Sequence, residues 1–330
     1  MNTIVLENIN CDFCKSTSST EVLNGVDWEF QFSTEAKVVK CQRCNLIWLN
    51  PRPDEASIKY VYPSIYGFYA EPLNPKYSLK GFMKNILDSL SPTPLQFVHL
   101  DKRKGNILDV GCATGSTLYP FGYKNSLHDL SRRGWNAYGC EISEDAASTG
   151  NESGLSIQPC SFESANFENN FFDVVRFNEV LEHSPSPLID LTKASKLLKS
   201  DGILIISVPN INSAAFHLFG KYWAGLDLPR HTYFYTPETL KNYFDKLGFE
   251  ILADCTDSTV PDFYHSLKHF LHSTIFNKKN LPCSTDNKLN EIYKGKKRSR
   301  LLLFLGLYPL VKYFNSVGLG ESYTVICKKK

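Results

Sequence analysis

The stretch Lys104-Gly-Asn-Ile-Leu-Asp-Val-Gly-Cys-Ala-Thr-Gly115 decides the fold. Its apolar positions 107, 108 and 110 form the short continuous run that is typical of a buried parallel strand. Gly111 and Gly115 predict a turn in which the backbone approaches a ligand closely before a helix begins. Asp109 adds a carboxylate at the end of the strand, which favours a ligand with a positive group over a phosphate. The spacing Gly-x-x-x-Gly also differs from the glycine pattern of dinucleotide-binding folds.

Strands and helices alternate along the rest of the chain, and this alternation predicts an α/β fold with a parallel sheet. Further strands are expected at 137–142, 157–160, 173–180, 202–208, 249–255 and 323–327. Helices are expected between them, and the first of these is predicted to run from about Ser116 to Arg132. Polar residues beyond the carboxyl ends of such strands are expected to face a common ligand cleft.

Three segments taken together resemble the class I S-adenosylmethionine-dependent methyltransferases. Asp109–Gly115 resembles the first motif of that family, and Tyr138-Gly-Cys-Glu-Ile-Ser143 resembles its second strand. Phe172-Asp-Val-Val-Arg-Phe-Asn-Glu-Val-Leu-Glu-His183 resembles the fourth strand with its following loop. The resemblance covers about residues 100–255, and it implies a doubly wound, seven-stranded, mostly parallel Rossmann-like sheet.

The resemblance also implies S-adenosyl-L-methionine as cofactor and a set of residues around it. Glu141 would accept hydrogen bonds from the ribose hydroxyls. Glu163 would accept one from the adenine amine, with a solvated loop carboxylate as the alternative. Tyr66 and Tyr69 would fold over the cofactor, unless they pack the N-terminal region on the main domain. The expected cofactor-binding residues are Tyr66, Tyr69, Asp109, Gly111, Cys112, Ala113, Gly115, Glu141, Ile142, Phe162, Glu163, Asn178 and Glu179.

The N-terminal 53 residues carry two Cys-x-x-Cys units, Cys11–Cys14 and Cys41–Cys44. Four thiolates at this spacing can surround one zinc ion tetrahedrally, and a filled coordination sphere indicates a structural metal. Strands at Trp28–Phe32 and Lys37–Cys41 are expected to form a hairpin between the units. We therefore predict a zinc-ribbon-like domain at 1–53, and the alternative is four buried or redox-active thiols.

Residues of the acceptor site are expected in two loops that follow the fourth and fifth strands. His183 and His231 are the candidate general bases, because a histidine can deprotonate a hydroxyl near neutral pH. Arg230 can pair with an anionic substrate group, and Trp223 and Tyr233 are the other substrate-binding candidates. In the alternative interpretation, Arg230 and His231 tie the loop to the core through hydrogen bonds.

The ribbon together with Asp227-Leu-Pro-Arg-His-Thr232 resembles bacterial methyltransferases of surface-polysaccharide or secondary-metabolite pathways. That resemblance implies a small-molecule acceptor with a sugar hydroxyl, on a nucleotide-linked or lipid-linked glycan precursor. The remaining chain is predicted to form an aromatic and helical connector at 54–100, capping the cofactor site. A methyltransferase domain is predicted at 101–330, with a helical insertion at about 256–320. His265, His269 and His272 share a helix face within it, where packing is favoured over a metal site.

Charge argues against nucleic acid as the substrate, because 36 Lys and Arg nearly balance 34 Asp and Glu. An RNA- or protein-directed enzyme or binding module, with the ribbon as reader, is the alternative function. The N-terminus lacks the pattern of a signal peptide, which predicts a cytoplasmic protein. Basic residues at 294–300 precede the apolar run Leu301–Val311, which is shorter than the roughly 18 residues needed to span a bilayer. Contact with a membrane surface, a lid over the acceptor and a packed helix are the three interpretations of this segment.

Overall fold

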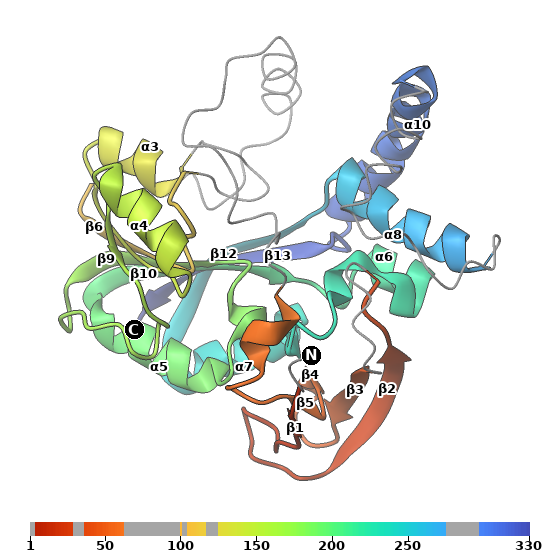
Figure 1. Cartoon of the computed structure of the whole chain (residues 1–330), viewed down its shortest axis with the longest axis horizontal. Helices are drawn as coiled ribbons and strands as arrows, with labels where there is room; N and C mark the ends of the chain where they lie inside the picture. The colour runs from red at the N-terminus through yellow and green to blue at the C-terminus, as the bar shows by residue number, and fades with distance from the viewer. Residues whose placement is uncertain (1–3, 29–35, 63–99, 101–103, 117–124, 275–296) are drawn as a thin grey trace.

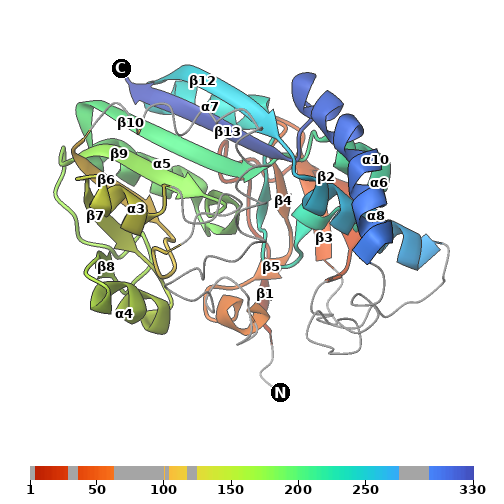
Figure 2. The same ribbon diagram turned by 90° about the horizontal axis from the view of Figure 1, so that it is seen from above.

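The computed structural model describes residues 4–28, 36–62, 100, 104–116, 125–274 and 297–330. Its centre is a seven-stranded sheet in the order β12-β13-β10-β9-β6-β7-β8 (Figures 1 and 2). The strands are β6 (Asn106–Val110), β7 (Asn136–Cys140), β8 (Ser156–Gln158), β9 (Phe172–Asn178), β10 (Leu198–Pro209), β12 (Phe249–Asp257) and β13 (Ser322–Lys329). Only β13 runs against its neighbours, β10 and β12. The predicted seven-stranded, mostly parallel sheet is therefore confirmed.

Helices cover both faces of the sheet, which makes it doubly wound (Figure 1). They are α3 (Leu127–Arg132), α4 (Glu144–Glu152), α5 (Pro187–Leu197) and α7 (Pro237–Leu247). Leu130 of α3 packs with Ile107 and Ile203 on one face, whereas Leu191 of α5 and Phe244 of α7 pack on the other. Apolar residues on both sides of each strand explain why the sequence shows continuous apolar runs rather than alternation.

Helix α3 begins later than the sequence predicts. Ser126 caps it by accepting a hydrogen bond from the Asp129 backbone N–H at 3.3 Å, and Asn125 before it has a left-handed φ of 61°. A Ser N-cap after a left-handed residue starts a helix at that point. The single helix predicted from about Ser116 to Arg132 therefore does not continue through Asn125 and Ser126, and residues 117–124 lie outside the described part of the chain.

The N-terminal region forms two small sheets. Strands β1 (Leu6–Glu7) and β5 (Arg52–Pro53) pair with each other, and η1 (Ile58–Val61) follows them. Strands β2 (Ser19–Gly25), β3 (Ala36–Cys41) and β4 (Ile47–Leu49) form the second sheet. The hairpin partner of β3 is therefore β2 and not the predicted strand at Trp28–Phe32. Trp28 lies in a turn and donates a hydrogen bond to the Lys221 carbonyl at 2.9 Å, while residues 29–35 are outside the described part.

The fourth strand of this N-terminal sheet comes from the main domain. It is β11 (Tyr233–Phe234), which pairs with β4 and lies in the loop region after β10. The same region contains α6 (Ala214–Phe219), η4 (Gly220–Tyr222) and η5 (Ala224–Leu226). The N-terminal region is thus joined to the loop region after β10 through backbone hydrogen bonds.

Helix α8 (Val260–Thr274) lies beside α6 at one end of the molecule, and α10 (Lys297–Ser316) packs against α8 (Figures 1 and 2). A second apolar core joins Val260 and Phe263 of α8 and Val311 of α10 to Phe219 and to Leu49 of the N-terminal sheet. Within the described ranges, no helix combines the length and apolar character that a membrane span requires.

Candidate active site

The glycine turn after β6 has the backbone geometry that only small residues accept. Gly111, Ala113 and Gly115 all have positive φ values, 64°, 48° and 71°. A Cβ atom on Gly111 would lie 2.7 Å from Cγ2 of Val180, in the loop after β9. The turn therefore needs glycine for its conformation and for the close approach of the β9 loop.

Glu141 is the first residue after β7. It lies beside this turn because β6 and β7 are paired in parallel. Its two carboxylate oxygens accept hydrogen bonds from the backbone N–H groups of Ala113 and Ser143, both at 2.9 Å. Burial raises the pKa of Glu141 above its ordinary value. The next side chain, Ile142, is 62% exposed. A fixed carboxylate and an exposed apolar side chain thus stand side by side at the edge of the turn.

Asp109 has a different role from the one that its position predicts. Its carboxylate is 4% exposed and pairs with the guanidinium of Arg176 on β9, at 2.8 and 2.5 Å. Arg176 is fully buried and also donates to the Asn125 carbonyl at 2.9 Å. The predicted attraction of Asp109 for a positive group of the ligand is therefore corrected, because Arg176 neutralises its charge. The only sequence signal for Arg176 was a lone arginine in an apolar strand.

The other expected cofactor residues are arranged around the same turn. The Cys112 sulfur packs where a side chain on Gly139 would lie, and Asn178 ends β9. Phe162 is buried and packs edge-on against Phe177, with ring centroids 5.3 Å apart. Glu163 is exposed, and its carbonyl accepts a hydrogen bond from Lys193. The predicted roles of Tyr66 and Tyr69 concern residues outside the described part of the chain.

The Glu179 carboxylate points toward β13. Its φ is 54°, and its carboxylate accepts a hydrogen bond from Ser322 of β13 at 2.9 Å. Strand β13 is separated from β9 by β10, so the side chain extends away from β6. Burial raises the pKa of Glu179 to about 7. Its contact with the cofactor stays a prediction.

The two predicted bases meet in one buried cluster. His183 belongs to η3 (Leu181–His183) after β9, and His231 belongs to the loop before β11. Their ring centroids are 4.6 Å apart. Between them lies Glu182, 1% exposed, whose Oε1 atom is 3.9 Å from His183 Nε2 and 3.8 Å from His231 Nε2. The sequence analysis assigned no role to Glu182, because nothing in the sequence marks a carboxylate as buried.

Both imidazoles are held through their Nδ1 atoms. His183 Nδ1 lies 3.1 Å from the Arg230 carbonyl and 2.9 Å from the Tyr62 hydroxyl, and His231 Nδ1 lies 2.9 Å from the Gly225 carbonyl. Burial lowers the pKa of His183 to about 3 and also lowers the pKa of His231. Both rings are therefore neutral near pH 7. Tyr62 is a further site residue to which the sequence analysis gave no role.

The three predicted substrate-binding side chains are buried. Arg230 is fully buried and pairs with Asp27 of the N-terminal region, at 2.9 and 3.0 Å, and with Asp227. This agrees with the alternative interpretation, in which Arg230 ties the loop to the core. Trp223 is 1% exposed and donates to Glu321 at 3.1 Å, and Tyr233 is 1% exposed within β11. Their assignment to the acceptor stays a prediction.

The four N-terminal cysteines lie together. Sγ of Cys11 is 3.4 Å from that of Cys44, and Sγ of Cys14 is 3.5 Å from that of Cys41. Four thiolates bound to zinc at about 2.3 Å would lie roughly 3.8 Å apart, so this arrangement fits one tetrahedral ion. Each Cys-x-x-Cys unit is followed by a residue with positive φ, Lys15 or Asn45. The two units therefore fold as equivalent turns around a common centre.

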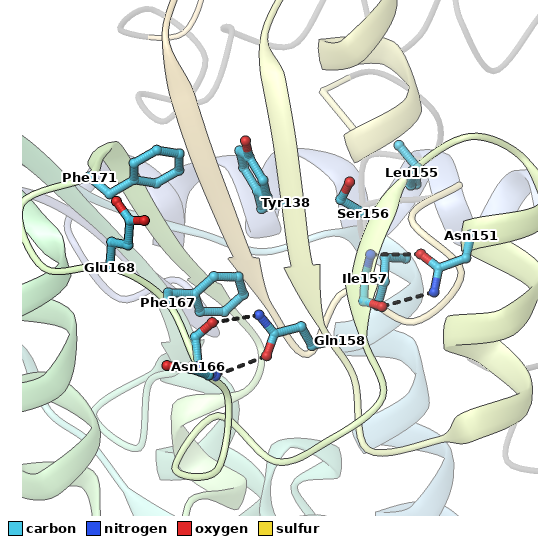
Figure 3. Close-up of a pocket in the computed structure, with 10 residues that line it drawn as sticks. All are labelled: Tyr138, Asn151, Leu155, Ser156, Ile157, Gln158, Asn166, Phe167, Glu168 and Phe171. Carbon is cyan, nitrogen blue, oxygen red and sulfur yellow. Dashed lines mark hydrogen bonds between the residues drawn. The ribbon is translucent and has the colours of Figure 1, made fainter.

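A separate hollow of about 500 Å³ lies beside edge strand β8 (Figure 3). Its amide side chains bind neighbouring backbone. The Asn151 side chain forms hydrogen bonds with the backbone N–H and carbonyl of Ile157. The Gln158 side chain does the same with the backbone of Asn166, and all four distances are 2.7 to 2.9 Å. These groups stabilise the edge of the sheet, and the hollow is distinct from the turn after β6.

The doubly wound sheet, the glycine turn after β6 and the acidic end of β7 together define the class of Rossmann-like, nucleotide-cofactor enzymes. Residues 79–254 match the family model described as "Methyltransferase domain", and the chain belongs to this family. It is a class I S-adenosylmethionine-dependent methyltransferase. The turn at residues 111–115, with its positive φ values, and the fixed Glu141 carboxylate fit that cofactor.

Similar proteins carry related names. The ubiquinone biosynthesis O-methyltransferase of Cereibacter sphaeroides is 26% identical over 227 residues, which cover 65% of this chain and 82% of the relative. The protein of the same name from a Ruegeria species is 33% identical over 154 residues, which cover 43% and 59%. Among solved structures, a SAM-dependent methyltransferase from Archaeoglobus fulgidus is 17% identical with a TM-score of 0.44, covering 76% of this chain and 94% of the other.

Proposed function

We propose that this enzyme transfers the methyl group of S-adenosylmethionine to a hydroxyl of a small-molecule acceptor. The observation that carries the proposal is the pair of histidines, His183 and His231, whose ring centroids lie 4.6 Å apart in loops near the glycine turn. Val180 packs on Gly111, so the loop that bears His183 borders the turn. A neutral imidazole can accept the proton that a hydroxyl loses when its oxygen attacks the sulfonium methyl. The His183 side chain is 22% exposed and that of His231 is 10% exposed, which makes His183 the more accessible base.

Within the cofactor site, we assign the ribose hydroxyls to Glu141 and the adenine ring to Ile142 and Phe162. The 62% exposure of Ile142 supports this, because an apolar side chain beside a fixed carboxylate suits a ring attached to a ribose. The exposed Glu163 carboxylate remains the candidate acceptor for the adenine amine. Asn178 and the backbone of residues 111–115 complete the proposed set.

We propose a sugar hydroxyl as the first acceptor to test, on a nucleotide-linked or lipid-linked glycan precursor. The support is the combined resemblance of the cysteine-rich region and of Asp227–Thr232 to methyltransferases of surface-polysaccharide pathways. A phenolic hydroxyl is the second candidate, because the relatives are named ubiquinone biosynthesis O-methyltransferases. In both cases the atom that is methylated is an oxygen.

We further propose a structural zinc ion on Cys11, Cys14, Cys41 and Cys44, in a domain that comprises residues 1–53. The sulfur separations support a tetrahedral ion, and four cysteine ligands leave no position for water or substrate. The connector at 54–100 and the methyltransferase domain at 101–330 complete the proposed division. Zinc would then stabilise the platform on which β11 and Arg230 are held.

Contact with an anionic membrane surface is a further proposal for the segment 294–311. Tyr308, Leu310 and Tyr313 of α10 are 39 to 60% exposed, and the sequence places basic residues at 294–300, before this part of the helix. Exposed apolar residues that follow a basic segment suit such a membrane. Sedimentation with vesicles containing phosphatidylglycerol tests it, and binding that Tyr308→Ser/Tyr313→Ser leaves unchanged would contradict it.

Two measurements test the function itself. Titration calorimetry should detect binding of S-adenosylmethionine and no binding of NAD, and binding of NAD alone would end the cofactor assignment. Radiolabelled methyl transfer is then measured with nucleotide-sugars and with catechols that carry a polyprenyl chain. Salt-sensitive RNA binding together with methyl transfer to RNA alone would favour the RNA-directed alternative.

Variants of the two histidines test how the acceptor is deprotonated. We expect His183→Gln and His231→Gln each to lower kcat by roughly 10²- to 10⁴-fold, with the Kd for S-adenosylmethionine unchanged. The matched control is His217→Gln, an exposed histidine in α6 that contacts Asn212. Wild-type turnover in both site variants would refute the role of this cluster and leave the cofactor assignment intact.

A further inference from the structure

The cluster around Glu182 is chemically unusual for a buried site. One carboxylate oxygen of Glu182 and one nitrogen from each of His183 and His231 lie within 4.8 Å of one another. A fourth group, the Asp227 carboxylate, brings Oδ2 to 3.8 Å from His231 Nε2. Two imidazoles and two carboxylates thus converge on one small volume from the loops after β9 and β10.

The hydrogen bonds of the histidines determine which atoms face that volume. A carbonyl oxygen only accepts hydrogen bonds, so the His231 Nδ1 atom that contacts the Gly225 carbonyl carries the proton. His183 takes the same form when its Nδ1–H donates to the Arg230 carbonyl and the Tyr62 hydroxyl accepts. Each neutral ring then has an unprotonated Nε2 atom with a lone pair. Both of these atoms face Glu182 Oε1, at 3.9 and 3.8 Å. Three electron-rich atoms therefore point toward one another.

The Glu182 carboxyl group is buried with few partners. Its side chain is 1% exposed, and neither of its oxygens has a hydrogen-bond partner of good geometry in the part of the chain that the structure describes. The nearby cation, Arg230, is already paired with Asp27 and Asp227. A buried carboxyl group of this kind is either protonated or paired with a cation, and a bound metal ion would supply that cation.

We propose that Glu182, His183 and His231 bind a divalent transition-metal ion. The ligand set of two imidazoles and a carboxylate oxygen suits Zn²⁺ or Mn²⁺. Ligands about 2.1 Å from a tetrahedral ion lie roughly 3.4 Å apart, so the two Nε2–Oε1 separations of 3.9 and 3.8 Å need to close by about half an ångström. Carbonyls that accept from the Nδ1–H groups orient the rings as they do around known metal ions.

This site rests on the proposed function for its role in catalysis, although its existence does not. The loop that bears Glu182 and His183 contacts the cofactor turn through Val180 and Gly111. An ion here lies on the acceptor side and can take the acceptor hydroxyl as a further ligand, which lowers the pKa of that hydroxyl. With both Nε2 lone pairs bound to the ion, neither histidine would accept the hydroxyl proton, which would pass to water, so the metal site would replace the general-base role proposed above.

Manganese is the probe that separates this site from the cysteine cluster. Mn²⁺ prefers nitrogen and oxygen ligands, whereas the four thiolates retain Zn²⁺. The full-length protein, loaded with one zinc ion on its cysteines, is titrated with MnCl₂ and followed by electron paramagnetic resonance. We expect one bound Mn²⁺ per chain, and Glu182→Gln to weaken its binding at least about ten-fold. Added Zn²⁺ should displace it.

The matched control is Glu321→Gln, which alters another buried carboxylate outside the cluster. It should bind Mn²⁺ as the parent does, and near-ultraviolet circular dichroism with S-adenosylmethionine binding confirms that each variant is folded. The proposal is overturned if the parent binds no Mn²⁺ and retains only the one cysteine-bound zinc, or if Glu182→Gln leaves binding unchanged. Methyl transfer that persists in such a metal-free protein leaves the proposed function standing. Conversely, Mn²⁺ binding without hydroxyl methylation retains the site and removes the function.

Discussion

At the scale of single residues, Gly111 connects the cofactor turn to the acceptor loop. Replacement by alanine would place a Cβ atom 2.7 Å from Val180 and strain a φ of 64°. We expect Gly111→Ala to lower the free energy of unfolding by roughly 1–3 kcal/mol and to weaken S-adenosylmethionine binding. Urea unfolding and titration calorimetry measure the two effects.

The matched control for this change is Gly154→Ala. Gly154 also has a positive φ, 92°, but an added Cβ would have no neighbour within 4 Å. Gly154→Ala should therefore lower the free energy of unfolding through backbone strain alone, with no loss of affinity for S-adenosylmethionine. Equal cofactor affinities in the two variants would contradict the proposed coupling of the turn to Val180.

Glu321 provides a residue-scale prediction about pH. Burial and the charge of Asp262 raise its pKa from 4.5 to about 8. Between these values the unfolded chain releases a proton that the folded protein keeps, so the free energy of unfolding falls as pH rises. The contribution of this group to the slope is at most about 1.4 kcal/mol per pH unit.

The variant Glu321→Gln isolates that contribution. Glutamine keeps a carbonyl oxygen for the Trp223 indole and cannot ionise, so the decline in stability between pH 5 and 8 should become shallower. Urea unfolding at pH 5, 6, 7 and 8 measures the difference. Parallel curves for parent and variant would show that Glu321 ionises normally in the folded protein.

At the scale of elements, sequence patterns identified the sheet and its ligand-facing loops but not the pairing of polar groups. Strands β6, β7 and β9 were predicted from apolar runs and motifs, because burial on both faces leaves a clear signal. The ion pair between Arg176 and Asp109 was not predicted, because it depends on how β6 and β9 are aligned with each other, which the sequence does not show. Strand β11 is short and derives its stability from β4, far away in the sequence, so no local pattern could reveal it.

The Arg176–Asp109 pair gives the element-scale prediction. It joins β6 to β9 and, through Asn125, to the start of α3. We expect Arg176→Met to destabilise the protein by about 3–5 kcal/mol, because Asp109 is left as an unpaired buried charge. Arg176→Met/Asp109→Asn should recover part of that loss in a double-mutant cycle. Additive effects of the two substitutions would argue against a direct interaction.

At the scale of the whole molecule, the cysteine-rich region and the methyltransferase sheet share structure. Strand β11 completes the N-terminal sheet, Arg230 pairs with Asp27, and Asp12 accepts hydrogen bonds from Tyr243 and from the Leu188 backbone at the start of α5. The loop between Asp227 and β11 carries His231, so the same contacts fix the position of His231 beside Glu182 and His183. The proposed zinc ion should therefore support the active site from a distance.

Removal of that ion tests the connection. We expect the zinc-loaded protein to unfold in one cooperative transition, and Cys14→Ser/Cys41→Ser to shift the whole transition to lower temperature because β4 no longer supports β11. Cys255→Ser, at a half-buried cysteine on β12, is the control and should retain both zinc and the parent transition. Calorimetry and methyl-transfer assays follow the two effects together. If the variant instead loses only a small early transition, while the main transition and turnover stay at parent values, the N-terminal region is energetically independent of the catalytic sheet. Unchanged zinc content in the double variant would place the metal elsewhere.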